Sequence, residues 1–295
     1  MKKITIGSRG SDLALWQANH IKQQLEELGA EVSITIIKTQ GDAIQHLSFD
    51  KMEGKGFFTK ELETALLDQS IDLAVHSHKD LETNFPEGLT IAAVSEREDP
   101  SDLLLICKNA VDESQKWGLK QGAVVGTSSA RRKSQVMRYR PDVTIQDLRG
   151  NVPTRIQKLA DGGYDAILLA KAGIDRLKIK LDDFHVVVLD PRAFVPAPAQ
   201  GVLGLQIREN DTELAKLLSE LNHKAVQQRI AVERKVLNLL QGGCQLPLGV
   251  YCPDEQNVYV SFGENWEDGA ILAHYEVEDL ENIAEIIVED LHNPE

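Results

Sequence analysis

Ala123-Val-Val-Gly-Thr-Ser-Ser-Ala-Arg-Arg132 passes from a short apolar run, through a turn of small polar residues, into a predicted helix. A short apolar run that ends at glycine is typical of a buried strand. A strand followed at once by a helix is half of a βαβ unit, which favours a sheet covered by helices. This stretch therefore predicts an α/β fold.

The same order of elements occurs earlier in the chain. Strands are expected at 3–6, 31–38 and 71–75, and helices at 11–28 and about 57–69. Three short stretches have counterparts in the second half: Ile6-Gly7-Ser8 and Val125-Gly126-Thr127, Gly54-Lys-Gly56 and Gly150-Asn151-Val152, Ile71-Asp-Leu-Ala-Val75 and Tyr164-Asp-Ala-Ile-Leu168. We predict two similar α/β lobes, each with a parallel sheet, that bind a ligand in a cleft at the carboxyl ends of their strands.

The rest of the chain predicts two further features. One segment crosses back from the second lobe to the first, and a third domain follows. Phe194-Val-Pro-Ala-Pro-Ala-Gln200 reads as a crossover, after which a strand at 202–207 could return to the first lobe. A long helix from about 222, strands at 258–262 and 270–275, and a helix at 279–291 follow. The predicted domains are 1–98 plus about 194–221, 99–193, and a smaller α+β domain at 222–295.

Arginine is concentrated in one region. Six of the thirteen arginines fall between Arg131 and Arg155, together with Lys133 and only two carboxylates, Asp142 and Asp147. Some of these arginines lie at two predicted helix starts, where unpaired N–H groups and guanidinium forks suit anionic groups. The region predicts a site for a polyanionic ligand; a solvated helix face is the alternative.

The overall charge disfavours nucleic acid as a partner. The net charge is −14, and residues 236–295 carry 13 acidic residues and no Lys or Arg. A nucleic-acid-binding protein usually has a basic face and a high pI. The N-terminus lacks the apolar core of a signal peptide, the sequence shows no membrane span, and three cysteines without framework spacing favour the cytoplasm.

Two residues are candidates for the chemistry. Cys244 lies in the predicted loop Gln241-Gly-Gly-Cys-Gln-Leu-Pro247, whereas Cys107 is expected in a buried strand and Cys252 is expected to be structural. Asp80 ends Val75-His-Ser-His-Lys-Asp80, at the carboxyl end of a predicted strand, where a carboxylate suits acid–base or electrostatic work. His76, His78 and Asp80 alternate and could suggest a metal site, but no further ligand cluster accompanies them, so no metal is expected.

Taken together, these motifs resemble the porphobilinogen deaminase (hydroxymethylbilane synthase) family. The resemblance covers almost the whole chain and also rests on Ser8-Arg9-Gly-Ser11, Leu13-Ala-Leu-Trp-Gln17, Gly54-Lys-Gly56-Phe57-Phe58, Glu96-Arg-Glu-Asp-Pro100, Leu148-Arg-Gly-Asn-Val152 and Pro196-Ala-Pro-Ala-Gln200-Gly201. It implies two lobes like those of type II periplasmic binding proteins. It also implies a monomeric cytoplasmic transferase of porphyrin (haem) biosynthesis that joins four porphobilinogen molecules into the linear tetrapyrrole hydroxymethylbilane.

The resemblance also implies roles for single residues. Cys244 would carry a dipyrromethane cofactor through a thioether, and Asp80 would be catalytic beside the pyrrole nitrogens. The remaining residues would bind cofactor and substrate: Arg9, Ser11, Gln17, Lys51, Lys55, Ser77, Lys79, Thr127, Ser128, Ser129, Arg131, Arg132, Arg149, Gly150, Arg155, Arg176 and Gln200.

Two positions depart from the family pattern. His78 stands where an apolar residue is more frequent, and Ala199 stands where glycine is common before Gln200. Neither change removes a charged group, so they affect local packing. The alternative from another class is a non-catalytic cytosolic two-lobed anion-binding protein, which would have no use for Cys244 or Asp80.

Overall fold

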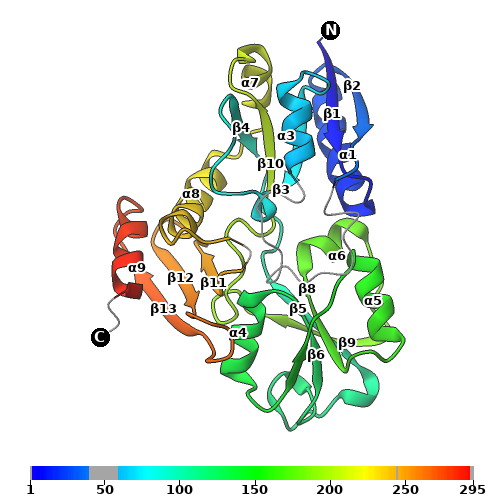
Figure 1. The fold of residues 1–295 in the computed structure, drawn as a ribbon, viewed down its shortest axis with the longest axis vertical. Helices are drawn as coiled ribbons and strands as arrows, with labels where there is room; N and C mark the ends of the chain where they lie inside the picture. Colours follow the sequence, from blue (N-terminus) through cyan, green and yellow to red (C-terminus); the bar gives the residue numbers. More distant parts are fainter. Residues whose placement is uncertain (1, 40–58, 244, 293–295) are drawn as a thin grey trace. The chain divides into compact units, whose positions relative to one another are not determined.

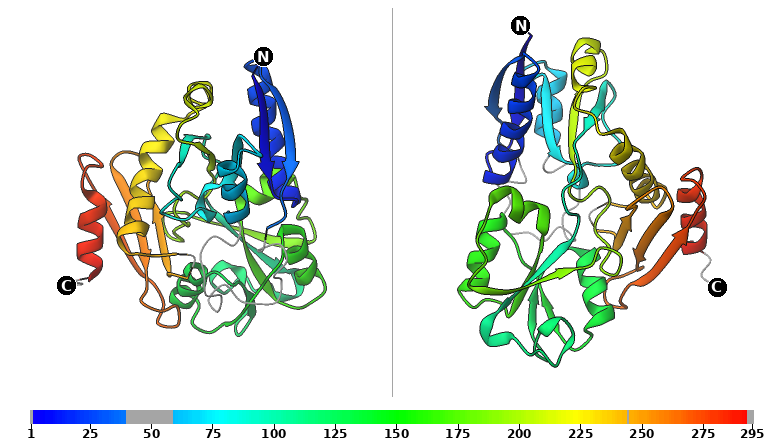
Figure 2. Two further views of the ribbon diagram at one scale, coloured as in Figure 1. Left: turned by 45° about the horizontal axis from the view of Figure 1, so that its top comes forward. Right: turned by 180° about the vertical axis from the view of Figure 1, so that it is seen from behind.

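The computed structural model describes residues 2–39, 59–243 and 245–292. Its contacts divide the chain into two compact units. Of the described residues, the first unit contains those up to Glu98 together with Gln200–Gln228, and the second contains those of Asp99–Ala199 and from Arg229 onward. Figures 1 and 2 show the helices and strands of each unit.

The first unit contains a five-stranded mixed sheet. Its strands, in spatial order, are β2 (Glu31–Ile36), β1 (Lys3–Ser8), β3 (Leu73–Ser77), β10 (Leu203–Arg208) and β4 (Leu89–Val94). β1 is parallel to β2 and β3, whereas β10 is antiparallel to both of its neighbours. The expected parallel arrangement is therefore correct for β2, β1 and β3 but does not extend to β10, because the strand that returns after the crossover enters in the opposite direction.

Helices cover both faces of this sheet. α1 (Asp12–Glu27) and α7 (Thr212–Leu218) pack on one face, and α3 (Lys60–Leu67) packs on the other. The alternation of side chains along β3 explains this arrangement, since Leu73 and Val75 belong to the first cluster and Ala74 to the second. Gly29, with φ of +87°, follows α1 in the left-handed region that glycine favours.

The second unit contains a sheet with the same pattern. Its strands, in spatial order, are β7 (Thr144–Gln146), β6 (Val124–Gly126), β8 (Ala166–Ala170), β5 (Asp102–Cys107) and β9 (Phe184–Leu189). The first three are parallel, and β5 is antiparallel to both of its neighbours. α4 (Ala130–Tyr139) packs on one face, while α5 (Val152–Ala160) and α6 (Lys171–Leu177) pack on the other.

A three-stranded antiparallel sheet follows in the same unit. It consists of β11 (Leu248–Tyr251), β12 (Asn257–Phe262) and β13 (Ile271–Glu276). Its core also takes apolar side chains from α8 (Lys224–Leu239) and α9 (Ile283–His292). The sequence analysis predicts β12, β13 and both helices but not β11. The three sheets confirm the predicted α/β class with two similar lobes and a small C-terminal α+β part.

Candidate functional site

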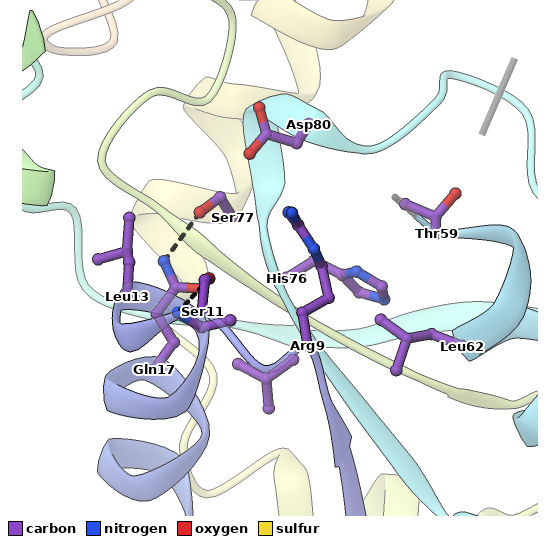
Figure 3. Close-up of a pocket in the computed structure, with 11 residues that line it drawn as sticks. Arg9, Ser11, Leu13, Gln17, Thr59, Leu62, His76, Ser77 and Asp80 are labelled. Atoms are coloured by element: carbon purple, nitrogen blue, oxygen red, sulfur yellow. Dashed lines mark hydrogen bonds between the residues drawn. The ribbon is translucent and has the colours of Figure 1, made fainter. Parts of the chain in front are cut away.

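A pocket in the first unit collects several of the predicted residues (Figure 3). The residues that line it are Arg9, Ser11, Leu13, Ala14, Gln17, Thr59, Leu62, Val75, His76, Ser77 and Asp80. The end of β1, the start of α1 and the end of β3 meet at the same edge of the sheet, which explains why residues 9–17 and 75–80 come together.

Local hydrogen bonds fix the geometry of this pocket. Ser11 is the N-cap of α1, and its hydroxyl accepts a hydrogen bond from the Ala14 N–H at 3.4 Å. The buried Gln17 side chain donates to Ser77 Oγ at 2.8 Å and so joins α1 to the end of β3 (Figure 3). Gln17, one of the residues predicted to bind cofactor and substrate, therefore supports the pocket wall.

Asp80 lies in the short 3-10 turn His78–Asp80 that follows β3, and it is exposed. Figure 3 shows the Arg9 side chain running from the end of β1 past His76 toward the side of the pocket where Asp80 lies. The pocket thus combines a guanidinium group, a carboxylate and three hydroxyl groups, those of Ser11, Thr59 and Ser77.

The 3-10 turn breaks the alternation that suggested a metal site. β3 ends at Ser77, so His76 belongs to the strand whereas His78 and Asp80 belong to the turn. His76 makes a buried hydrogen bond to Gln206 instead. Among the described residues, no group of three or more His, Cys, Asp or Glu side chains could hold a metal ion.

Lys79 and Gln200 form a second pair beside the turn. Lys79 Nζ donates to Gln200 Oε1 at 3.1 Å, and Arg97 Nε donates to the Gln200 carbonyl oxygen at 3.0 Å. The residue before Gln200, Ala199, has φ of +61°, in the left-handed region. This backbone conformation favours glycine, the residue that the resemblance leads us to expect before Gln200.

The second unit holds the predicted hydroxyl cluster at the start of α4. Ser129 is the N-cap and accepts from the Arg132 N–H at 3.4 Å. Ser128 Oγ accepts from the Leu148 N–H at 3.0 Å and donates to the Leu148 carbonyl at 3.1 Å. Thr127 N–H donates to the Gln146 carbonyl at 2.8 Å. The turn before α4 is therefore tied to the segment that leads into α5.

The buried carboxylate Asp102 engages two of the predicted arginines. Arg131 Nη1 lies 2.8 Å from Asp102 Oδ2, and Arg132 Nη2 lies 2.7 Å from Asp102 Oδ1. Burial acts to raise the pKa of Asp102, but the two guanidinium groups outweigh it and hold this pKa well below its usual range. Much of the donor capacity of these arginines is thus directed into the protein.

The start of α5 carries the next group of predicted residues. Asn151 is the N-cap, accepting from the Thr154 N–H at 2.9 Å, and Arg155 Nε donates to the Gly150 carbonyl at 2.7 Å. Gly150 has φ of +117°, and a Cβ there would lie 2.7 Å from Thr154 Cγ2, so glycine is required. Arg149 is half-buried in the same turn, and Arg176 is buried in α6.

Arg138 and Arg140 do not belong to this group. Arg138 Nη1 donates to the Ala270 carbonyl at 2.9 Å. Arg140 pairs with Asp142 and also donates to three backbone carbonyls, those of Lys116, Leu119 and Lys120. The six clustered arginines therefore divide into two with structural roles, two bound to Asp102 and two at the start of α5.

Three predicted residues, Lys51, Lys55 and Cys244, lie outside the described residues. Of the other thiols, Cys252 is buried in the C-terminal part, and Cys107 is only partly buried at the end of β5. Cys107 lies in a buried strand as expected, but the residue itself is only partly buried because it is the last of that strand.

The sequence analysis does not identify four polar residues whose hydrogen bonds hold predicted site residues or their neighbours in place. Asp102 binds Arg131 and Arg132, and Gln206 and Glu63 continue a hydrogen-bonded chain from His76. Buried Glu233 accepts from the N–H groups of Ala199 and Cys252, at 2.7 and 2.8 Å. A polar residue inside an otherwise apolar strand, such as Gln206 in Val202-Leu-Gly-Leu-Gln-Ile207, is the one available signal.

Fold and site define an α/β protein with two similarly built lobes whose arginine, hydroxyl and carboxylate groups gather at strand-to-helix turns. The family model described as "Porphobilinogen deaminase, dipyromethane cofactor binding domain" matches residues 4–216. The chain belongs to the porphobilinogen deaminase family.

Curated relatives agree with this assignment. The chain is 49% identical over 251 residues to a porphobilinogen deaminase from Nitratidesulfovibrio vulgaris, covering 84% of this chain and 78% of that one. It is 47% identical over 252 residues to a porphobilinogen deaminase from Sulfurimonas denitrificans, covering 85% and 79%.

Solved structures include two distant neighbours. A Salmonella typhimurium periplasmic binding protein with high arginine specificity is 13% identical, with a TM-score of 0.43, covering 77% of this chain and 94% of that one. A putative methionine-binding lipoprotein from Bacillus subtilis is 12% identical, with a TM-score of 0.45, covering 76% and 92%. Scores this low carry no argument about the site.

Proposed function

We propose that the chain is a hydroxymethylbilane synthase, a transferase that deaminates porphobilinogen and joins four of these molecules head-to-tail into hydroxymethylbilane. Membership of the porphobilinogen deaminase family over residues 4–216 carries this proposal. The groups of the two units fit the substrate, because each porphobilinogen has carboxylate side chains, a pyrrole N–H and an amine to lose.

Asp80 is the proposed catalytic residue. Positive charge develops on the pyrrole nitrogen as porphobilinogen loses ammonia, and a fixed carboxylate stabilises that charge where a neutral group would not. Support comes from the place of Asp80 at the edge of a pocket that also contains Arg9, Ser11 and Ser77. In this pocket Arg9 would bind a substrate carboxylate, and the two hydroxyl groups would orient it.

The turns of the second unit are proposed to bind acetate and propionate groups. Thr127, Ser128 and Ser129 precede α4, whose first N–H groups suit an anion, and Arg149, Gly150 and Arg155 do the same at α5. Arg131 and Arg132 would act mainly by fixing this turn through Asp102, and buried Arg176 would add a third guanidinium group. In the first unit, Lys79 and Gln200 form the pair that steadies the turn of Asp80.

The donor set also fits a dipyrromethane cofactor, because its two pyrrole rings carry the same carboxylate side chains as the substrate. The attachment through a thioether to Cys244 is part of the proposal, as are the contacts of Lys51 and Lys55. When bound, the cofactor supplies the primer on which the tetrapyrrole is extended. The chain's own residues hold its carboxylates and keep Asp80 in place.

The proposal also covers the oligomeric state, the location, the partners and the domain division of the protein. The enzyme acts as a monomer in the cytoplasm, and neither nucleic acid nor a membrane is a partner. Within the described residues, no helix has both the length and the apolar character needed to span a membrane. The division into lobes at 1–98 plus about 194–221 and at 99–193, with a C-terminal domain at 222–295, also remains a proposal.

The direct test is turnover of porphobilinogen by the purified protein. We expect one ammonia for each porphobilinogen consumed and one linear tetrapyrrole for every four. The tetrapyrrole cyclises with loss of water to a colourless porphyrinogen, which an added oxidant converts into a coloured porphyrin. A protein that binds porphobilinogen without releasing ammonia would support the alternative, a non-catalytic anion-binding protein.

A further inference from the structure

A buried hydrogen-bonded chain runs from the pocket into the first unit. His76 Nε2 lies 3.0 Å from Gln206 Oε1, and Gln206 Nε2 donates to Glu63 Oε1 at 3.2 Å. The three residues come from β3, β10 and α3, so Gln206 of the neighbouring strand β10 holds the His76 side chain, and Glu63 of α3 in turn holds Gln206. His76 and Gln206 are buried.

The chemistry of the three side chains fixes the tautomer of His76. An ionised Glu63 carboxylate can only accept a hydrogen bond, so the amide nitrogen of Gln206 must face it. The amide oxygen then faces His76, and Nε2 must carry the proton of the neutral ring. Nδ1 is therefore left as a hydrogen-bond acceptor, and among the described residues it has no hydrogen-bond partner.

The surroundings keep this imidazole neutral. Burial lowers the pKa of His76 to about 4; the hydrogen bond to Gln206 opposes this shift, and the positive charge of Arg9 adds to it. The charged groups around the ring are Arg9 beyond β1, Glu63 of α3 and Asp80 after β3. Burial also raises the pKa of Glu63, although the hydrogen bond from Gln206 opposes this.

We propose that His76 is a further ligand-binding residue of the pocket, whose Nδ1 accepts a hydrogen bond from an N–H group of bound porphobilinogen. His76 lines the same pocket as Arg9, Ser77 and Asp80 (Figure 3). A neutral acceptor orients the substrate without adding a positive charge that would compete with the one developing on the pyrrole. The proposal rests on the assignment of this pocket to porphobilinogen.

Nitrogen NMR of the holoenzyme tests the tautomer directly. With 15N-labelled histidine, the His76 signals are those missing from His76→Gln. We expect a proton on Nε2, none on Nδ1, and no titration between pH 5.5 and pH 9, given a pKa of about 4. A proton on Nδ1, or titration near the ordinary histidine value of about 6.5, would overturn the proposal.

The contact with substrate is tested by adding porphobilinogen to slowly reacting Asp80→Asn holoenzyme. We expect the Nδ1 resonance of His76 to move, while that of His274, which is exposed on β13, stays in place. If Asp80→Asn turns over slowly but its His76 signal does not move, the proposed role of His76 is wrong while the assignment of the pocket stands. If Asp80→Asn turns over at the wild-type rate, the assignment of the pocket to porphobilinogen is wrong.

A Gln206→Glu variant supplies a kinetic readout that a purely structural role would not change. A carboxylate beside Nε2 favours the imidazolium form, which turns Nδ1 from an acceptor into a donor. We expect KM for porphobilinogen to rise about three- to tenfold at pH 6 and to recover at pH 8.5, the size of one neutral hydrogen bond. His274→Gln should follow the wild-type profile, and a Gln206→Glu profile parallel to wild type would contradict the proposal.

Discussion

Arg131 Nη1 lies 2.8 Å from Asp102 Oδ2, and both side chains are buried. Asp102 starts β5, whereas Arg131 lies in the first turn of α4, so the pair joins a strand to the helix whose N-terminus carries the hydroxyl cluster. Arg131 Nη1 also donates to the Val195 carbonyl at 2.9 Å. The pair therefore anchors the turn of Thr127, Ser128 and Ser129.

Replacing Arg131 should destabilise the protein more than it changes chemistry. Arg131→Met leaves the buried Asp102 with one guanidinium partner instead of two, and breaking such a pair costs about 3–5 kcal/mol. We expect a lower midpoint in urea unfolding and reduced cofactor content. Arg192→Met, at an exposed arginine, is the matched control and should unfold like wild type. Equal midpoints for both variants would contradict the anchoring role.

The pair of Arg131 and Asp102 also predicts that the free energy of unfolding falls at acidic pH. The pKa of Asp102 is lowered in the folded state, so the pairing contributes its full stability above the unfolded value of about 3.9 and loses it as the pH falls toward the lower folded value. We expect the unfolding midpoint of the wild type to fall below pH 4 more steeply than that of Asp102→Asn. Parallel curves for the two proteins would exclude this linkage.

Asp80→Asn should fold and hold the cofactor but turn over slowly. Asparagine has nearly the same shape without the charge, and loss of one fixed electrostatic partner typically costs a factor on the order of 100 to 1000 in kcat. Asp80→Glu, which keeps the charge but displaces it by one methylene, should retain more activity. Ammonia release at matched cofactor content measures both, with exposed Asp182→Asn as control. A wild-type rate in Asp80→Asn would assign the role to another group.

Intact-protein mass should reveal the covalent cofactor. We expect active enzyme to exceed the mass of its chain by two linked pyrrole units, with the excess on the peptide that contains Cys244. Cys244→Ala should lose this excess, whereas Cys107→Ala should keep it. Active enzyme with the bare chain mass would rule out the attachment.

Gly201 should tolerate no side chain. Its φ is +93°, and a Cβ there would lie 2.4 Å from the Glu98 carbonyl oxygen, which is backbone and cannot rotate away. Gly122 has a similar φ of +67° with nothing within 4 Å, so it isolates the cost of the backbone conformation. We expect Gly122→Ala to lose about 1–2 kcal/mol and Gly201→Ala clearly more. Equal losses in urea unfolding would mean that the backbone near Gly201 relaxes.

The sequence predicts those parts of the fold whose cause is local. Periodicity and turn residues place β1, α1 and β3 within a few residues of their observed bounds, and they predict where α4 and α5 begin. The sequence does not predict strands β4, β7, β9 and β11, nor the antiparallel direction of β10. The direction of a strand depends on the edge at which the chain re-enters the sheet, and the residues next to the strand in sequence do not encode that edge.

The residues of the site also divide into those that the sequence places by a local pattern and those that it does not. Arg9, Ser11, Ser77 and Asp80 could be placed together because they follow strands that end at one edge. The partners Asp102 and Gln206 could not, since each lies 29 or more positions along the chain from the side chain it binds. The charge count of the arginine-rich region was also incomplete, because the carboxylate that neutralises Arg131 and Arg132 comes from outside that region.

The place of β10 between β3 and β4 sets the order in which the two five-stranded sheets can fold during synthesis. During synthesis, the first 98 residues emerge with the edges of β3 and β4 unpaired, and the strand that fills the gap ends only at Arg208. All of Asp99–Ala199 must leave the ribosome before the first sheet can close. The second sheet, whose five strands are contiguous in sequence, has no such delay, so the nascent chain should complete its middle before its beginning.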